Sequence, residues 1–293
     1  MEDEKKTGAQ EDKKNFGRIK RAVISAVDAN GNGQLDVEDI IIGAIRVPGV
    51  KIDRASYLRH QLHTRFPEDV IELAVAENPR IAGIPLEIID ELADEAIKYE
   101  RTIVSGISAA LSIPGGWAIV ATLPVDIAQY YGCMLRVAQK LLYLYGFPQI
   151  DMEEKDAILD DTTLNVLVAC FAVMNGVAGA NSALRGIAAA LGRGVSRQLK
   201  AARLSQNAFY NAIKATLRKY FEKKINKTIF AGFFEKAIPV VGGIIGGGLT
   251  YLSFKPCCDK LKAVLRDTIL SNPDYKPGDE IDIIDIAADE AED

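Results

Sequence analysis

Three long stretches without a charged residue limit what this chain can fold into. They span residues 102–125, 162–184 and 237–254. The first two are long enough to cross a bilayer as helices, but all three are rich in small residues, and the first and third are interrupted by Pro or Gly. Small residues let helices approach closely, both in a membrane bundle and in a tightly packed globular protein. Two alternatives therefore stand, with buried helical hairpins preferred to spans that insert in a membrane.

Helix signals recur along the rest of the chain. Asp53 is placed to cap one helix, and Pro67 and Pro85 stand where two others begin. Only residues 280–286 alternate polar and apolar side chains, and they could form a short strand or a linear docking motif. We predict an all-α fold, a multi-helix bundle with apolar Gly/Ala-rich helical hairpins, preceded by an EF-hand-like helix–loop–helix unit.

The length and the charge distribution suggest parts of unequal size. A chain of 293 residues with 48% hydrophobic residues can bury a substantial core. We expect a disordered charged leader at 1–14, the helix–loop–helix unit at 15–50, a helical domain at 51–271 and an acidic tail at 272–293. The first twenty residues lack the apolar stretch of a secretory signal.

The four cysteines do not suggest a disulfide framework. Cys133, Cys170, Cys257 and Cys258 contain no CxxC spacing, and a bridge between the vicinal pair would need a strained ring. We interpret them as reduced thiols, which predicts a cytoplasmic protein.

Residues 28–39 have the pattern of a calcium-binding loop. They read DANGNGQLDVED, with oxygen-bearing side chains at loop positions one, three, five, nine and twelve. Gly33 holds position six, where the chain turns sharply, and the next residue offers its backbone carbonyl. Helical patterns at 16–27 and 37–47 flank the loop. The predicted ligands are Asp28, Asn30, Asn32, Gln34, Asp36 and Asp39.

The last loop position departs from the usual EF-hand pattern. Position twelve is usually a Glu that binds calcium with both oxygens, whereas here it is Asp39. The loop resembles those of dockerin modules, which commonly end in Asp, although those modules carry two loops and this chain shows one. The alternatives are magnesium in place of calcium, or an Asn-Gly-rich polar turn that binds no metal.

A basic segment follows the second uncharged stretch. Residues 193–227 carry ten basic residues against the single acid Glu222, in a chain of net charge −5. Interleaved apolar residues at helical spacing leave three alternatives: a solvated surface helix, a helix on anionic lipid, or nucleic-acid binding. The acidic overall charge and the lack of a nucleic-acid motif argue against the last. The candidate membrane or polyanion surface comprises Arg197, Lys200, Arg203, Lys214, Arg218, Lys219, Lys223, Lys224 and Lys227.

Residues 113–150 and 238–254 resemble the bacterial EcsC family. The shared features are a Pro-Gly-Gly turn, a Leu-Pro-x-Asp step at 123–126, a Tyr-Gly-Phe after a long helix, and a Pro-x-x-Gly-Gly run near the end. The resemblance covers about residues 85–270. It implies a helical protein loosely associated with membranes and with transport or secretion machinery, and it implies no catalytic residues.

No catalytic motif is assembled in the sequence. The two histidines, His60 and His63, would share one helix face, but no third metal ligand stands nearby. Asp126, a lone carboxylate between apolar runs, is interpreted as a helix cap rather than a functional group. Phosphate-binding loops and nucleophile elbows are missing from the sequence.

These observations predict a calcium-binding, non-catalytic helical protein of the bacterial cytoplasm. It would dock to a protein partner, or act as a peripheral protein at the inner face of the cell membrane. One alternative is an integral or membrane-inserting protein associated with a pore or transporter. Another is an enzyme of unknown reaction.

Overall fold

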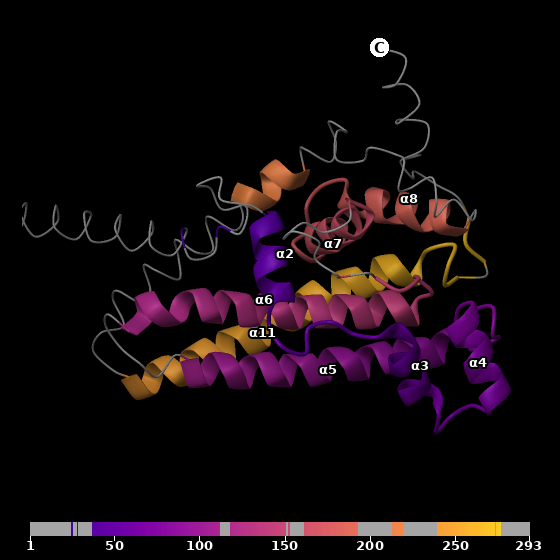
Figure 1. Ribbon diagram of the computed structural model, residues 1–293, viewed down its shortest axis with the longest axis horizontal. Coiled ribbons are helices and arrows are strands. Elements are labelled where there is room, and N and C mark those ends of the chain that lie inside the picture. Colours follow the sequence, from indigo (N-terminus) through magenta and orange to yellow (C-terminus); the bar gives the residue numbers. More distant parts are fainter. Residues whose placement is uncertain are drawn as a thin grey trace, which may run out of the picture.

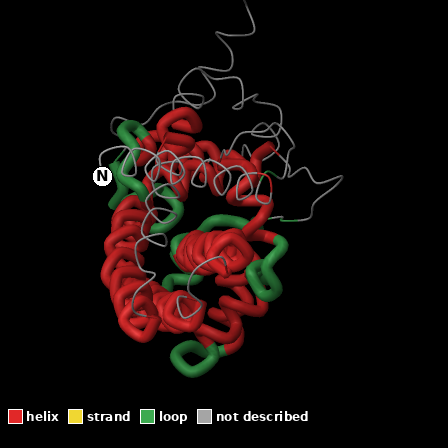
Figure 2. Tube along the Cα trace, turned by 90° about the vertical axis from the view of Figure 1, so that its left-hand side faces the viewer, coloured by secondary structure: helices red, strands yellow, loops and turns green. Residues whose placement is uncertain are grey.

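The computed structural model describes residues 37–111, 118–150, 161–192, 213–219, 239–272 and 274–276, together with residues 25, 28 and 152. Throughout these ranges the regular secondary structure is helical, as Figure 2 shows, which confirms the predicted all-α fold. The labelled helices are α2 (Val37–Ile45), α3 (Arg54–Leu62), α4 (Glu68–Ala76), α5 (Leu86–Leu111), α6 (Ala118–Leu144), α7 (Asp161–Met174), α8 (Ala180–Gly192) and α11 (Pro239–Arg266). A short helix also covers residues 213–219.

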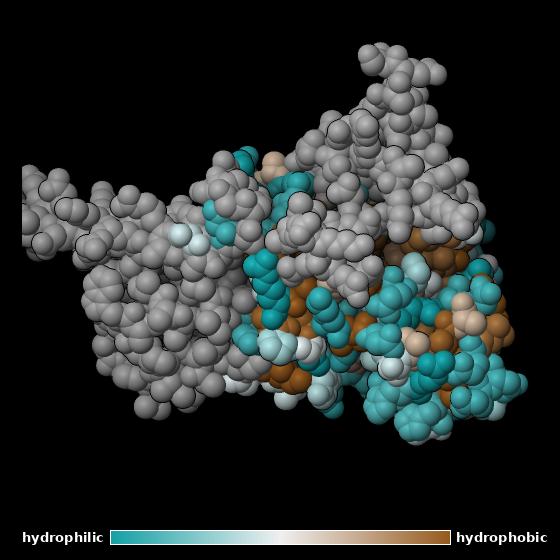
Figure 3. Space-filling view, in the orientation of Figure 1, coloured by the Kyte–Doolittle hydropathy of each residue, from teal (hydrophilic) through white to brown (hydrophobic). Residues whose placement is uncertain are grey.

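The long helices α5, α6 and α11 form the centre of the molecule (Figure 1). Helix α5 runs antiparallel to α11, because Asp90 pairs with Arg266 and Asp94 with Lys262. Helices α3 and α4 lie at one end of this layer, α2 stands across α6, and α7 and α8 lie on the side away from α5. On the face in Figure 3, hydrophilic residues gather over α3 and α4, and hydrophobic residues gather at the centre.

Aromatic side chains join the central helices to α7. The Tyr131 ring of α6 meets Phe171 of α7 edge-on at a centroid distance of 5.8 Å. Its neighbour Tyr130 meets Phe254 of α11 in the same way at 6.2 Å. Edge-to-face pairs add to the stabilisation that burial provides. All four rings are buried, so they fix the relative positions of three helices around one core.

The uncharged stretch 162–184 does not form one continuous helix. It is divided between α7 and α8 by a turn in which Gly176 and Gly179 adopt φ values of 70° and 79°. Stretch 102–125 is shared between the end of α5 and the start of α6, with 112–117 outside the described residues. Among the helices that the structure describes, none combines the length and the apolar character needed to cross a membrane.

The predicted helix starts are confirmed, and one predicted cap is wrong. Asp53 caps α3 by accepting a hydrogen bond from the Ser56 backbone N–H at 2.8 Å. Helix α4 begins directly after Pro67, and α5 directly after Pro85. Asp126 caps no helix, because α6 already begins at Ala118 and runs through it. Residues 280–286 lie outside the described residues.

The segment between α2 and α3 is held on α6 by a buried amide. Gln139 donates from Nε2 to the Val50 carbonyl at 2.8 Å and accepts the Ile52 backbone N–H through Oε1 at 2.9 Å. Arg136 adds a bond from Nη1 to the Gly49 carbonyl at 3.0 Å. Buried backbone groups need such partners. These contacts fix the C-terminal side of α2 to the bundle.

Candidate functional site

Two of the predicted metal ligands lie within the described residues. Asp28 is half-buried in a non-helical conformation, and Asp39 is fully buried in the first turn of α2. The other four predicted ligands, Asn30, Asn32, Gln34 and Asp36, lie outside the described residues. The structure therefore places only the two ends of the predicted loop.

The burial of Asp39 sets the chemistry at the start of α2. The apolar residues of this helix, among them Val37, Ile40 and Ile41, pack into the core around it. A carboxylate at a helix N-terminus interacts favourably with the helix dipole. Complete burial of its charge nevertheless requires a compensating hydrogen bond or cation. A buried oxygen donor of this kind fits the ligand preference of Ca²⁺ or Mg²⁺.

The described residues do not by themselves assemble a metal centre. Within them, the side chains of His, Cys, Asp and Glu form no group of three or more that could hold an ion. His60 and His63 stack with ring centroids 5.5 Å apart, and His63 Nδ1 lies 2.6 Å from the His60 carbonyl oxygen. The calcium site therefore stays a prediction that rests on the pattern of residues 28–39 and on the burial of Asp39.

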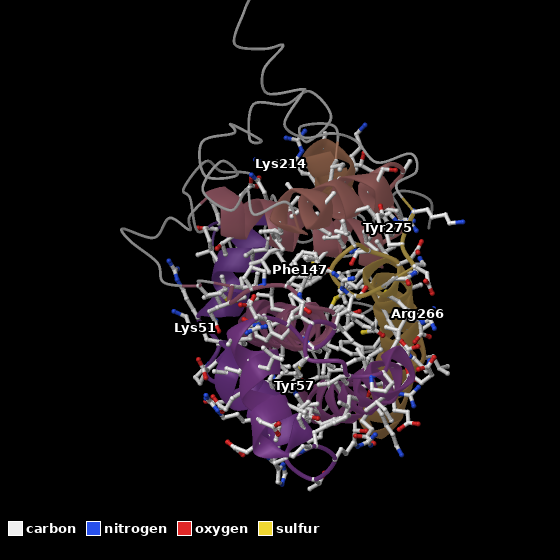
Figure 4. The ribbon with its side chains drawn as sticks, turned by 90° about the vertical axis from the view of Figure 1, so that its right-hand side faces the viewer. Lys51, Tyr57, Phe147, Lys214, Arg266 and Tyr275 are labelled. Atoms are coloured by element: carbon white, nitrogen blue, oxygen red, sulfur yellow. The ribbon has the colours of Figure 1, made fainter. Side chains whose placement is uncertain are left out.

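An ion pair joins the end of the predicted loop to the basic segment. Glu38, which directly precedes Asp39, pairs through Oε1 with Lys214 Nζ. Lys214 belongs to the short helix 213–219, whose Ile213 and Leu217 are buried in the core. In Figure 4, Lys214 lies at the top of the coloured ribbon, and Tyr57 lies toward its other end.

The structure describes three of the nine predicted surface cations. Of these, Lys219 is exposed, and Lys214 and Arg218 are half-buried. Because Ile213 and Leu217 pack against protein, the apolar side of helix 213–219 is not turned toward solvent. This arrangement agrees with the solvated-surface alternative for these seven residues. The other six cations, Arg197, Lys200, Arg203, Lys223, Lys224 and Lys227, lie outside the described residues.

A second polar centre, which the sequence analysis missed, surrounds Glu100 of α5. This carboxylate is fully buried, and its Oε1 accepts hydrogen bonds from Lys140 Nζ at 2.6 Å and Arg136 Nε at 3.1 Å. Both cations come from α6, so the pairs connect two of the three central helices. Charge-assisted hydrogen bonds in a buried setting are among the stronger ones in proteins.

Two tyrosines flank the Lys140 ammonium group. Its Nζ lies 5.8 Å from the centroid of the Tyr57 ring and 4.9 Å from that of Tyr99. Both distances fall within the range of a cation–π contact. Burial, followed by the charges of Glu100 and Glu95, raises the pKa of Tyr57, so its hydroxyl keeps its proton.

Cys133 of α6, one of two cysteines that feel the charge of Glu100, is unsuited to act as a nucleophile. Burial, and next the charge of Glu100, raises the pKa of Cys133 to about 12. The same two causes contribute to a raised pKa of Cys258 in α11. Because the thiolate is the reactive form, these buried thiols are inert at neutral pH.

The sequence did hold a signal for the burial of Glu100. Ile89, Ala93, Ile97 and Val104 of α5 are buried at helical spacing, and Glu100 falls on the same face. A charge on the inward face of an amphipathic helix indicates a buried polar group. Its partners were not predictable from the sequence, because Lys140 lies 40 positions further along the chain.

Comparison with known proteins adds no relative. No family model matches the chain, and the searches of curated proteins and of solved structures find no match. The resemblances to the EcsC family and to EF-hand and dockerin loops therefore rest on the residues quoted for them.

Proposed function

We propose that the protein binds a calcium ion through residues 28–39 and docks, without catalysis, to an anionic membrane surface or a protein partner. The observation that carries the proposal is the fully buried carboxylate of Asp39, at the end of an oxygen-rich segment and in the first turn of α2. A buried carboxylate needs hydrogen bonds or a cation around it, and oxygen donors of this kind are the ligands that Ca²⁺ prefers.

The donor set favours calcium over softer metals. Its side chains are Asp and Asn, and Gln34 contributes a backbone carbonyl, so every donor is an oxygen. Ca²⁺ accepts six to eight oxygens in flexible geometry, whereas Mg²⁺ demands a near-ideal octahedron and keeps several waters. The flexible coordination shell of Ca²⁺ also tolerates Asp39 at the last loop position, where the side chain is shorter than the usual Glu. Magnesium is the second candidate.

The ion pair between Glu38 and Lys214 offers a route from the ion to the basic segment. A bound Ca²⁺ offsets the negative charge of the loop carboxylates, and this weakens the electrostatic attraction of the region for Lys214. Lysine side chains released in this way add to the positive potential that attracts anionic lipid. In this proposal calcium strengthens docking, and helix 213–219 acts through its charges, because Ile213 and Leu217 are already buried.

Calorimetric titration tests ion binding. Asp36→Ala removes a ligand side chain, and Asp69→Ala removes an exposed carboxylate of α4 as the matched control. We expect a calcium affinity at least tenfold weaker in Asp36→Ala and unchanged in the control. The absence of any calcium heat up to millimolar concentration, with the chain folded by circular dichroism, would overturn the ion site.

Liposome flotation tests docking and identifies its kind. Vesicles with and without phosphatidylserine are compared in calcium and in chelator, followed by a carbonate wash. A peripheral protein floats only with anionic vesicles, more strongly in calcium, and washes off. Resistance to the wash would instead support the membrane-inserting alternative. The combined change of Lys219, Lys223 and Lys224 to Gln should reduce flotation, while Lys98→Gln on α5 should not.

A further inference from the structure

Two buried oxygen atoms at the Glu100 centre have no protein partner among the described residues. One is Oε2 of Glu100, and the other is the hydroxyl of Tyr57 in α3. Glu100 is fully buried as a residue, and Tyr57 is partly exposed as a residue although its hydroxyl oxygen is buried. Buried polar atoms are nearly always hydrogen-bonded, so each of the two requires an explanation.

The two atoms belong to one neighbourhood, because Lys140 lies beside both residues. Its Nζ is 2.6 Å from Glu100 Oε1 and 5.8 Å from the centroid of the Tyr57 ring. The charge of Glu100 also contributes to the raised pKa of Tyr57, which agrees with this placement. A single small molecule between the two atoms would give each of them a hydrogen-bond partner.

The charges around the site restrict what that molecule can be. Lys140 and Arg136 together carry two positive charges against the one of Glu100, which disfavours a further cation. An anion without a proton cannot donate to Oε2. Tyr57 retains its proton and can donate. The remaining candidate is a small neutral molecule that accepts from a hydroxyl and donates to a carboxylate, and water is the smallest.

We propose an internal water-binding site between the Tyr57 hydroxyl and Oε2 of Glu100. The water accepts the O–H of Tyr57 and donates to the carboxylate, so both atoms gain a partner. Buried waters typically make about three hydrogen bonds to groups that otherwise lack them. The site links α3 to the pair of α5 and α6, and it thereby holds the α3–α4 end of the molecule on the bundle.

A high-resolution crystal structure of the full chain tests the proposal directly. We expect one water within hydrogen-bonding distance of both atoms. A direct Tyr57–Glu100 hydrogen bond, a metal ion at the site, or a dry contact would each overturn it. In the crystal structure of Tyr57→Phe, the water should be lost or should no longer be shared between the two positions.

Unfolding measurements supply a second test with a matched control. Lys140 lies over the rings of both Tyr57 and Tyr99, but only Tyr57 has a buried hydroxyl without a protein partner among the described residues. Tyr57→Phe should lower the folding equilibrium constant about tenfold, the order expected when a buried carboxylate loses part of its hydrogen bonding. Tyr99→Phe should leave the constant nearly unchanged. Equal effects of the two variants would contradict the proposal.

Discussion

Arg54 Nε donates a hydrogen bond to the Phe147 backbone carbonyl at 3.0 Å, which ties the start of α3 to the segment after α6. The same guanidinium donates from Nη1 to the carbonyl of Val75 at 2.6 Å, and from Nη2 to those of Ala74 at 3.2 Å and Glu77 at 2.9 Å. The last carbonyls of a helix have no partner within it. Arg54 thus caps the C-terminal end of α4, and its positive charge interacts favourably with the helix dipole there.

Replacement of Arg54 by Lys should destabilise the protein. Arg54 is 7% exposed, and burial lowers its pKa, so its charge depends on the four carbonyls that surround it. A lysine ammonium keeps the charge but cannot reproduce the planar fork that reaches carbonyls in two segments. We expect a loss of about 2–4 kcal/mol in the free energy of unfolding by urea titration.

Arg59→Lys provides the control for this change. Arg59 forms a bidentate pair with Glu72 on the exposed surface between α3 and α4. Exposed pairs contribute little to stability. A similar loss in the Arg54 and Arg59 variants would show that the buried carbonyl contacts are not what makes Arg54 important.

The cap of α3 predicts a second effect on stability. Asp53 accepts the Ser56 backbone N–H at 2.8 Å, so one of the first N–H groups of α3 gains a partner. Asp53→Ala should lower the free energy of unfolding by about 1 kcal/mol, whereas Asp53→Asn, another good cap residue, should lose much less. Thermal and urea unfolding of the three proteins at neutral pH checks the order. An Ala variant as stable as the Asn variant would contradict it.

Acid should abolish the advantage of Asp53 over Asn. Side-chain and backbone hydrogen bonds with Ser56 lower the pKa of Asp53 in the folded state. A carboxyl whose pKa is lower when folded stabilises the protein above its unfolded pKa of about 4. That stabilisation is lost as the pH falls through the folded pKa. The difference in unfolding free energy between wild type and Asp53→Asn should therefore shrink below about pH 4, and a constant difference would refute the assignment.

The features that could be predicted from the sequence are those that depend on residues close together along the chain. The starts at Asp53, Pro67 and Pro85 were predictable, because caps and prolines act on the next turn of chain. The predicted cap at Asp126 was wrong, since the helix that contains it begins earlier. Capping patterns in the sequence do not predict where a helix begins when its packing in a bundle decides that position.

Interactions between distant segments were beyond the sequence analysis. Arg54 and Phe147 lie 93 positions apart, and a lone arginine before a helix gives no sign of the carbonyls it will meet. Glu100 stood on an apolar helix face, which indicated burial but not its partners in α6. For the proposed metal site, the pattern of residues 28–39 predicts the ligand types, and the structure adds the burial of Asp39.

Gly146 is predicted to resist substitution even by alanine. Its φ is 93°, a conformation that side chains other than glycine rarely adopt, and a Cβ here would stand 2.7 Å from the Leu270 carbonyl oxygen. Gly146→Ala should therefore cost roughly 2 kcal/mol or more, because backbone strain and a backbone clash combine. Urea unfolding measures this loss.

Gly43 in α2 offers the opposite case. A Cβ at this position would meet nothing within 4 Å among the described residues, and the residue lies inside a helix. Alanine there should stabilise by about 0.5–1 kcal/mol, since it loses less conformational entropy on folding. A Gly146→Ala variant that equals or exceeds Gly43→Ala in stability would mean that the turn after α6 is not as tight as described.

Native-state alkylation should distinguish Cys257 from the other three cysteines. None of the four forms a disulfide within the described residues, but Cys133, Cys170 and Cys258 are buried and Cys257 is partly exposed. Burial is the main cause that raises the pKa of each buried thiol, to about 12 for Cys133. Iodoacetamide at pH 8 should modify Cys257 first, and the others only after unfolding in urea, because alkylation needs an accessible thiolate.

Peptide mass spectrometry assigns the modified positions. Cys257→Ser should remove the native-state reaction and leave three thiols that react in urea. Raising the pH from 7 to 9 should not bring Cys133 into the native-state reaction, because burial holds its pKa at about 12, well above that range. Rapid native labelling of Cys133 would mean that the Glu100 centre opens to solvent, and the charges assigned to it would then be screened by water.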